Sequence, residues 1–243
     1  MANKYVLLNN VEHQNVKVIT ERSARYGDDV NFALTFPLEF RNIQACYPIF
    51  FRKDANTGQF LPIALFGFEP RENLYLDDDG WDAHYIPLMI RRHPFLIGFQ
   101  QVSGEGDTKQ AVVSIDMNSP RVNESEGESL FLEHGGISDY LSSMTEMLET
   151  IQLADEMNAG FVDALLQLDL IEAVTMQVEL KDRSKHELLG YYTIDELKLQ
   201  QLDSDTLGNL HSKHYLDSIY MILASLSCVR TLIEKRNDRL ADA

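Results

Sequence analysis

The hydrophobic residues in the first half of the chain form short, aromatic-rich runs separated by polar turns. Two pairs of runs flank segments rich in Gly, Asn and Asp, a composition that favours tight turns, so each pair predicts a β-hairpin. The first pair is 47–51 and 60–68 around the turn 54–58, and the second is 95–102 and 111–115 around the turn 104–107.

Proline positions predict two short helices in the same half. Pro37 opens the segment 37–45 with a backbone angle suited to a first helical position. The segment 87–93 ends before Pro94, which disfavours helical geometry at the residue that precedes it.

From residue 137 onward the apolar spacing becomes helical. Ser138 can cap a helix over 139–157, which Asn158 and Gly160 are expected to interrupt before a restart at 161–170.

A further hairpin is predicted from 174–180 and 187–194 around 181–185. The segment 215–235 is expected to form one helix that buries an apolar stripe within the same chain. The stripe consists of Leu216, Ile219, Tyr220, Leu223, Leu226, Val229 and Ile233.

Between these two parts lies a polar segment, 116–136, in which Glu124, Glu126 and Glu128 alternate with small residues. We interpret it as an exposed connection. The expected fold class is therefore α+β. The expected organisation is a single domain, 1–243, with a β-rich half 1–115 of hairpins and short helices and a helix-rich half 137–243 with one further hairpin.

The charge of the chain argues against several classes of partner. Its 243 residues include 38 Asp and Glu against 21 Lys and Arg, a formal net charge of −17. Nucleic acid and anionic membrane surfaces attract clustered cations, so neither is expected as a partner. The longest apolar runs, such as 60–68 and 219–226, are about half the ~20 residues that cross a bilayer, so no membrane insertion is expected.

The chain is expected to be cytoplasmic. The first ten residues lack the apolar stretch of a secretory signal. Its two cysteines, Cys46 and Cys228, form no Cys-x-x-Cys unit and fit buried thiols in a reducing compartment better than a disulfide framework.

The acidic residues are concentrated in the middle of the chain. Residues 101–200 hold 20 of the acidic and 6 of the basic side chains, a net charge of −14. Such a concentration usually marks solvated surface, and the alternative is a docking surface for a basic protein.

The densest group of chemically useful side chains lies between residues 69 and 95. Several aspartates accompany the only Trp, a His and a pair of arginines. An arginine can hold a carboxylate with two hydrogen bonds while the indole offers a stacking face, which suits an amino acid, a peptide terminus or a similar anion. The predicted ligand-binding residues are Glu72, Asn73, Asp79, Trp81, His84, Tyr85, Arg91 and Arg92.

A solvated turn is the alternative interpretation of this segment. Asp79 and Gly80 favour the positive φ of a tight hairpin, and the aspartates could pair with the arginines at the surface. A calcium loop is excluded because Gly80 stands fourth from Asp77 and the twelfth residue is Leu88 rather than Glu.

No metal, cofactor or catalytic residue is assigned. The groups His211, His214, Asp217 and Asp79, Asp82, His84 have suitable side chains but follow no known ligand pattern. The sequence also lacks a Gly-x-Ser-x-Gly elbow, a phosphate-binding loop, a His-Glu-x-x-His helix and a complete dinucleotide fingerprint. Purified protein is expected to contain no stoichiometric transition metal.

Several short motifs, taken in order, resemble the SapC family of bacterial proteins over about residues 5–236. They are 47–51 (YPIFF), 62–67 (PIALFG), 72–76 (ENLYL), 80–87 (GWDAHYIP), 91–95 (RRHPF), Leu130-Phe131 leading to Gly135 and Tyr140-Leu141, 190–199 (GYYTIDELKL), and Ile219-Tyr220 leading to Ala224-Ser225-Leu226. The family takes its name from a surface-layer locus. Its members are often encoded near flavin-dependent halogenase-like proteins, cupin-like proteins and TonB-dependent receptors, and the resemblance implies no catalytic residue set.

The leading functional hypothesis is a non-catalytic accessory or binding protein in a bacterial modification or uptake system. Its expected partner is a protein or peptide, with a small polar ligand as a further candidate. The alternative is an enzyme, with metal-assisted chemistry as one form of it, that works with halogenase-like or cupin-like neighbours. A surface-layer-associated structural role is the third hypothesis.

Overall fold

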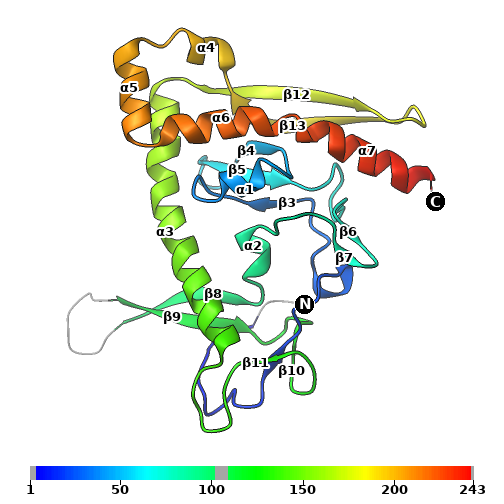
Figure 1. The fold of residues 1–243 in the computed structure, drawn as a ribbon, viewed down its shortest axis with the longest axis vertical. Helices are drawn as coiled ribbons and strands as arrows, with labels where there is room; N and C mark the ends of the chain where they lie inside the picture. Colours follow the sequence, from blue (N-terminus) through cyan, green and yellow to red (C-terminus); the bar gives the residue numbers. More distant parts are fainter. Residues whose placement is uncertain (1–3, 102–108, 242–243) are drawn as a thin grey trace. The chain divides into compact units, whose positions relative to one another are not determined.

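The computed structural model describes residues 4–101 and 109–241. Helices account for 35% and strands for 25% of the chain, with sheets in the N-terminal half and helices toward the C-terminal half, which confirms the α+β fold class (Figure 1). The predicted turn 104–107 lies outside the described residues.

Contacts between residues divide the chain into two compact units, and each unit combines two separate segments. Unit 1 comprises Met1–Asp28 and Leu88–Leu153, and unit 2 comprises Asp29–Pro87 and Ala154–Ala243. Both units therefore draw on both predicted halves of the sequence. The single-domain organisation stays a prediction.

Unit 2 is built on a five-stranded antiparallel sheet in the order β12-β13-β4-β5-β3. The strands are β3 (Phe32–Leu34), β4 (Ile49–Lys53), β5 (Phe60–Leu65), β12 (Ile171–Glu179) and β13 (Lys185–Ile194). The β4–β5 and β12–β13 pairs confirm the predicted hairpins at 47–68 and 174–194. The two hairpins join where Tyr191 and Tyr192 of β13 pair with Arg52 and Phe51 of β4. Two hairpins far apart in sequence thus form one sheet.

Helices accompany this sheet in unit 2. The short helix α1 (Phe40–Ile43) confirms the prediction for 37–45. The helices α4 (Glu196–Gln200) and α5 (Ser204–Ser212) were not predicted, although each begins at an aspartate cap: the side chains of Asp195 and Asp203 accept hydrogen bonds from the amides of Lys198 and Thr206.

The predicted single helix 215–235 is wrong, because the segment forms two helices, α6 (Tyr215–Ser225) and α7 (Cys228–Ala241). The predicted stripe is also only partly buried, since Ile219 is inaccessible whereas Tyr220 is 54% exposed. Ser225 is buried instead, and its hydroxyl accepts a hydrogen bond from the amide of Ile49 at 2.8 Å. A satisfied serine can occupy a core position that a count of apolar residues misses.

The helix α3 (Asp139–Gln167) is continuous, so the predicted interruption at Asn158 and Gly160 is wrong. Ser138 caps its start as predicted, because its hydroxyl accepts the amide of Leu141 at 3.1 Å. A Cβ atom on Gly160 would lie 2.8 Å from the hydroxyl of Tyr215. Glycine is therefore present for close packing and not as a helix end.

Unit 1 contains a three-stranded antiparallel sheet in the order β1-β9-β8. Its strands are β1 (Tyr5–Leu7), β8 (Phe95–Gln101) and β9 (Lys109–Asp116), and the β8–β9 pair confirms the second predicted hairpin. The helix α2 (Leu88–Arg91) confirms the short helix before Pro94. The core of the unit consists of Val16, Val18, Phe95, Ile115, Leu130, Phe131, Leu141, Met144, Met147 and Leu148.

The acidic segment 116–136, interpreted from the sequence as an exposed connection between two halves, belongs to unit 1. Its strands β10 (Val122–Asn123) and β11 (Glu128–Ser129) both pair with β2 (Lys17–Val18). Arg121 is buried within it, while residues 124–129 are exposed. The glutamates are therefore solvated as expected, but the backbone that carries them is part of the unit.

One helical stretch within the described residues, Tyr215–Ala241, is long and apolar enough to cross a membrane by length and composition alone. A core helix can pass the same test, and 28% of the stretch's most apolar window is buried, so this is weak evidence. The absence of membrane insertion stays a prediction. The cysteines are both free thiols and are half-buried rather than fully buried.

Candidate functional site

The eight residues predicted to bind a ligand fall into both units. Residues 72–85 of the set belong to unit 2, whereas Arg91 and Arg92 belong to unit 1. The predicted site as a whole stays a prediction.

In unit 2 the side chain of Trp81 belongs to a chain of hydrogen bonds. Its indole N–H donates to the hydroxyl of Tyr47 at 2.7 Å, and Tyr47 donates in turn to the carbonyl oxygen of Tyr85. The hydroxyl of Tyr85 donates to the buried carboxylate of Glu39 at 2.9 Å. Burial raises the pKa of the Tyr47 phenol above its ordinary value. These contacts show that Trp81 and Tyr85 help to hold unit 2 together.

Glu72 and Asn73 also make internal contacts. The carboxylate of Glu72 accepts the amide of Phe68 at 2.7 Å and lies 2.7 Å from the guanidinium of Arg236. Asn73 is buried, and its side chain accepts the amide of Tyr75 at 3.0 Å. Both residues therefore stabilise the loop in which they lie.

The remaining members of the set in unit 2, Asp79 and His84, are exposed. The strands β6 (Leu76–Asp77) and β7 (Gly80–Trp81) form the tight hairpin that the Asp-Gly pair favours, with Gly80 at φ +116°. Nearby, the Lys235 ammonium binds the carboxylate of Asp82 and lowers the pKa of that carboxyl.

Neither candidate metal group is assembled. Within residues 4–101 and 109–241, no three His, Cys, Asp or Glu side chains lie close enough together to hold a metal ion. This applies both to His211, His214, Asp217 and to Asp79, Asp82, His84.

Unit 1 contains a cleft of about 420 Å³ that the sequence did not predict. Four separate segments contribute to its wall: β1, residues 26–27, residues 93–95 at the start of β8, and residues 116–120 at the end of β9 and in the turn that follows. The lining residues are Tyr5, Tyr26, Gly27, His93, Pro94, Phe95, Asp116, Asn118, Ser119 and Pro120. The cleft thus combines aromatic faces with an imidazole, an amide, a hydroxyl and a carboxylate.

The turn after β9 is fixed by Asp116. Its carboxylate accepts the amides of Lys4 at 2.7 Å and Asn118 at 3.0 Å. The carboxylate oxygen that makes these bonds is directed to the backbone, so Asp116 fixes the turn that brings Asn118 and Ser119 into the wall of the cleft.

A buried ionic cluster positions the Tyr26 side of the cleft. Arg121 is 1% exposed, and its guanidinium donates to the carbonyl oxygen of Ile19 at 2.9 Å, to that of Glu21 at 2.6 Å and to the carboxylate of Asp28. The Arg121 guanidinium carbon also lies 5.3 Å from the centre of the Tyr26 ring. A buried cation that is paired on one side and stacked on another holds the ring in place.

A second arginine joins the same cluster. Arg22 lies 3.4 Å from the carboxylate of Asp28 and donates to the carbonyl oxygen of Ile90 at 3.1 Å. Burial is the main cause that lowers the pKa of Arg22, and the nearby positive charge of Arg121 lowers it further.

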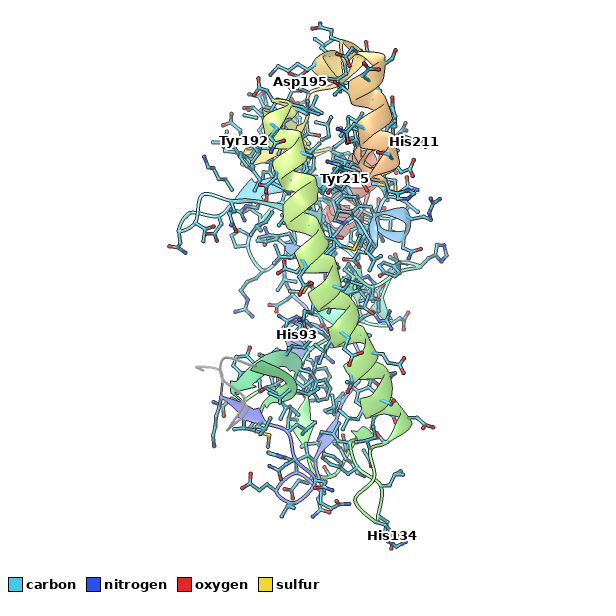
Figure 2. The ribbon with its side chains drawn as sticks, turned by 90° about the vertical axis from the view of Figure 1, so that its left-hand side faces the viewer. His93, His134, Tyr192, Asp195, His211 and Tyr215 are labelled. Carbon is cyan, nitrogen blue, oxygen red and sulfur yellow. The ribbon has the colours of Figure 1, made fainter. Side chains whose placement is uncertain are left out.

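His93 lines the cleft, and the charges of Arg92, Arg121 and Arg22 act on its imidazole. Figure 2 shows its place in the chain. Burial and the charges of Arg92 and Arg121 lower the pKa of its imidazole from 6.5 to about 4, against the opposing charge of Asp28. The imidazole is accessible to solvent although the walls of the cleft surround it, so water in the cleft screens part of this effect. His93 is therefore neutral at pH 7 and can either accept or donate a hydrogen bond.

Arg92, a member of the predicted site, lies in this same environment. It donates to the carbonyl oxygen of Phe95 at 3.0 Å, and its Nε is buried without a hydrogen-bond partner in the described part of the chain. Burial lowers the pKa of Arg92.

Sequence reasoning missed the cleft because its lining is drawn from residues 5 to 120. The one local signal was Asp116-Met-Asn118-Ser119-Pro120, whose residue types favour a hydrogen-bonded turn rather than a featureless connection.

A comparison with models of known protein families shows which family the chain belongs to. The SapC family model matches residues 8–232. The chain belongs to the SapC family. The range shared with the SapC model includes every residue of the predicted site and all cleft residues except Tyr5. Searches of curated proteins and of solved structures found no match.

Proposed function

We propose that this SapC-family chain is a non-catalytic binding or accessory protein and that the unit 1 cleft holds a small, negatively charged polar ligand. The observation that carries the proposal is the cleft itself, about 420 Å³ in volume, with Tyr26 and His93 in its wall. Pockets of roughly 300–1,000 Å³ with apolar walls and a few convergent polar groups are typical of small-molecule sites.

The charges around the cleft support an anion as the ligand. Arg22, Arg92 and Arg121 all affect the pKa of His93, whereas Asp28 is the acidic group that opposes them. Asp116 adds a second carboxylate in the cleft wall. The three arginines outnumber the two carboxylates, so the surroundings of the cleft carry excess positive charge although the formal net charge of the chain is −17. A carboxylate or phosphate group would be attracted there in preference to a neutral ligand.

The state of His93 supports binding rather than catalysis. A general acid or base works best when its pKa lies near the working pH. Burial, together with the charges of Arg92 and Arg121, lowers the pKa of His93, so at neutral pH the imidazole is uncharged and serves as a hydrogen-bonding group. The proposed setting is the cytoplasm of a bacterium, in a modification or uptake system.

The proposal is tested by calorimetric titration of the chain with succinate, L-glutamate and inorganic phosphate, with L-glutamine as the neutral counterpart of glutamate. At least one anion should bind more tightly than glutamine. Replacing His93→Ala should weaken binding of that anion about tenfold, because one hydrogen bond to a charged ligand is lost.

The matched control is His134→Ala, which alters an exposed histidine of the same unit outside the cleft (Figure 2). Its affinity should equal that of the wild type. If none of the three anions binds more tightly than glutamine, the anionic ligand is contradicted. An unchanged affinity of that anion for His93→Ala would exclude the cleft as its site.

A further inference from the structure

Unit 2 contains a larger cavity, of about 620 Å³, whose chemistry differs from that of the unit 1 cleft. Three elements form it: the segment around α1, the second part of α3, and the start of α6. Its lining residues are Pro37, Leu38, Arg41, Met157, Phe161, Lys213, His214, Tyr215, Asp217, Ser218 and Met221.

One side of this cavity is an accessible apolar wall. Leu38 is 49% exposed and Met157 is 51% exposed, although both are large hydrophobic residues. Behind them Phe161 is fully buried and meets the ring of Tyr215 edge-on, with 5.5 Å between ring centres. Figure 2 shows Tyr215 beside α3. Exposed apolar surface next to a rigid aromatic floor is suited to a hydrocarbon chain.

The other side of the cavity carries positive charge. Arg41 and Lys213 are exposed at its edge, and neither forms an ion pair within the described residues. The Lys213 ammonium lies 6.0 Å from the centre of the Tyr215 ring. Two cations against the single carboxylate of Asp217 leave the edge positive, in a chain with an excess of acidic residues.

The first turn of α6 adds hydrogen-bond donors at the same edge. His214 precedes the helix in a left-handed conformation, φ +59°, and its side chain makes no capping hydrogen bond to the amides that follow. Asp217, in that first turn, complements the positive end of the helix but is exposed. The cavity therefore has an apolar wall and a cationic, donor-rich edge.

We propose that this cavity binds an amphipathic carboxylate, with its hydrocarbon chain along Leu38, Met157 and Met221 and its head group at Arg41 and Lys213. A neutral hydrocarbon would leave the cations unused, and a short polar acid would leave the apolar wall exposed to water. Only a ligand with both parts matches both sides of the cavity. The inference is independent of the proposed function, because the cavity and all its residues lie in unit 2.

Methionine methyl groups provide a direct readout. We would label the chain with [methyl-¹³C]methionine and titrate it with decanoate below its micelle concentration. Met157 and Met221 line the cavity, whereas Met144 and Met147 lie in the core of unit 1. Decanoate should shift the signals of the first pair in a saturable way and leave those of the second pair unchanged.

Matched ligands and variants separate the two parts of the site. Decanol lacks the charge and butyrate lacks the chain, and each should bind at least about tenfold more weakly than decanoate. Arg41→Gln and Lys213→Gln should each weaken decanoate about tenfold, because they remove a charged partner but keep most of the side chain. The exposed Arg230, paired with Glu234 on α7, gives the control Arg230→Gln, which should bind as the wild type does.

A further variant, Leu38→Asp, should abolish binding, and because the side chain is half exposed it should leave the fold intact. The inference is overturned if decanoate leaves Met157 and Met221 unshifted. It is equally overturned if decanol binds as tightly as decanoate, or if both Gln variants bind decanoate with wild-type affinity.

Discussion

Unit 1 and unit 2 surround their cavities with opposite kinds of interior. The unit 1 cleft lies against a buried ionic cluster, in which Arg121 and Arg22 meet the carboxylate of Asp28. The unit 2 cavity lies against an aromatic cluster, in which the ring of Phe161 contacts those of Phe40 and Tyr215. A buried charge is tolerated only while its partners are in place, whereas ring packing is a sum of many weak contacts. The shape of the cleft therefore depends on a few polar contacts.

The largest expected effect follows from that dependence. Replacing Arg121→Met would remove one of the two guanidinium groups, those of Arg121 and Arg22, that pair with the buried carboxylate of Asp28. We expect the free energy of unfolding to fall by about 3 kcal/mol or more. Urea denaturation followed by circular dichroism measures the change.

An exposed pair in unit 2 provides the comparison for that variant. The Arg71 side chain is 82% exposed and lies 2.6 Å from the carboxylate of Asp29. Arg71→Met should cost only about 0–1 kcal/mol. Similar losses in the two variants would contradict the contrast between the buried cluster and the surface pair.

Glycines offer a second comparison of the two units. In unit 1, Gly127 has φ +98°, and a Cβ there would lie 2.3 Å from the carbonyl oxygen of Val18. Gly127→Ala should therefore lower the free energy of unfolding by about 2 kcal/mol or more, because backbone strain and a backbone clash add.

The matched variant in unit 2 is Gly58→Ala, in which the alanine would have a strained, left-handed backbone but its Cβ would not clash with another atom. Gly58 has φ +72°, and the nearest atom to a Cβ at this position would be in the Lys53 side chain, 3.9 Å away. About 1 kcal/mol is expected from the left-handed backbone alone. Thermal unfolding of both variants tests the order, and a larger loss for Gly58→Ala would contradict it.

A smaller effect is expected at Gly160 in α3. Alanine favours a helix by about 1 kcal/mol over glycine, but its Cβ would collide with the Tyr215 hydroxyl, 2.8 Å away. Gly160→Ala should thus gain little in the wild type and about 1 kcal/mol in a Tyr215→Phe background. Urea denaturation measures the change in the free energy of unfolding in each background. Equal changes would show that the Tyr215 hydroxyl is not what disfavours a side chain at position 160.

The last effect is a dependence on pH. His93 has its pKa lowered from 6.5 to about 4 in the folded chain. Between these values the unfolded chain binds more protons, so the free energy of unfolding should fall as the pH falls through this window. Above the window His93 is neutral in both states and contributes no pH dependence. The fall should be smaller in His93→Asn, and an identical fall in both proteins would contradict the lowered pKa.

The hairpins could be predicted from the sequence because their signals are local. Asp54 accepts the amides of Asn56 and Thr57 within the turn between β4 and β5, so the turn is specified by the residues that form it. The cap of α3 by Ser138 is local in the same sense.

Features that depend on distant partners could not be predicted. The sequence around Arg121 suggests a surface residue in a polar segment. Its burial is explained by partners 93 to 102 positions earlier, the carboxylate of Asp28 and the carbonyl oxygens of Ile19 and Glu21. The sequence alone suggests that Gly160 ends a helix, because the nearby hydroxyl of Tyr215, which explains the glycine, is 55 positions away in the sequence.

The candidate site shows the same limit. The sequence predicts a role for Arg92 but not the cleft next to it, because no local pattern unites Tyr26, His93 and Ser119. The sequence predicts Trp81 as a stacking face but not the hydrogen bond that its indole N–H donates to the hydroxyl of Tyr47. A concentration of polar residues in the sequence can therefore indicate internal hydrogen bonds as well as a ligand site.

The central claim is that the unit 1 cleft binds a small anion through His93. Its most direct test is the side-chain NMR spectrum of chain labelled with ¹⁵N-histidine, recorded with increasing amounts of the tightest-binding acid among succinate, glutamate and phosphate. The imidazole signals of His93 should shift with saturation, while those of His211 in unit 2 stay constant. Constant His93 signals at a ligand concentration that saturates the calorimetric titration would contradict the claim.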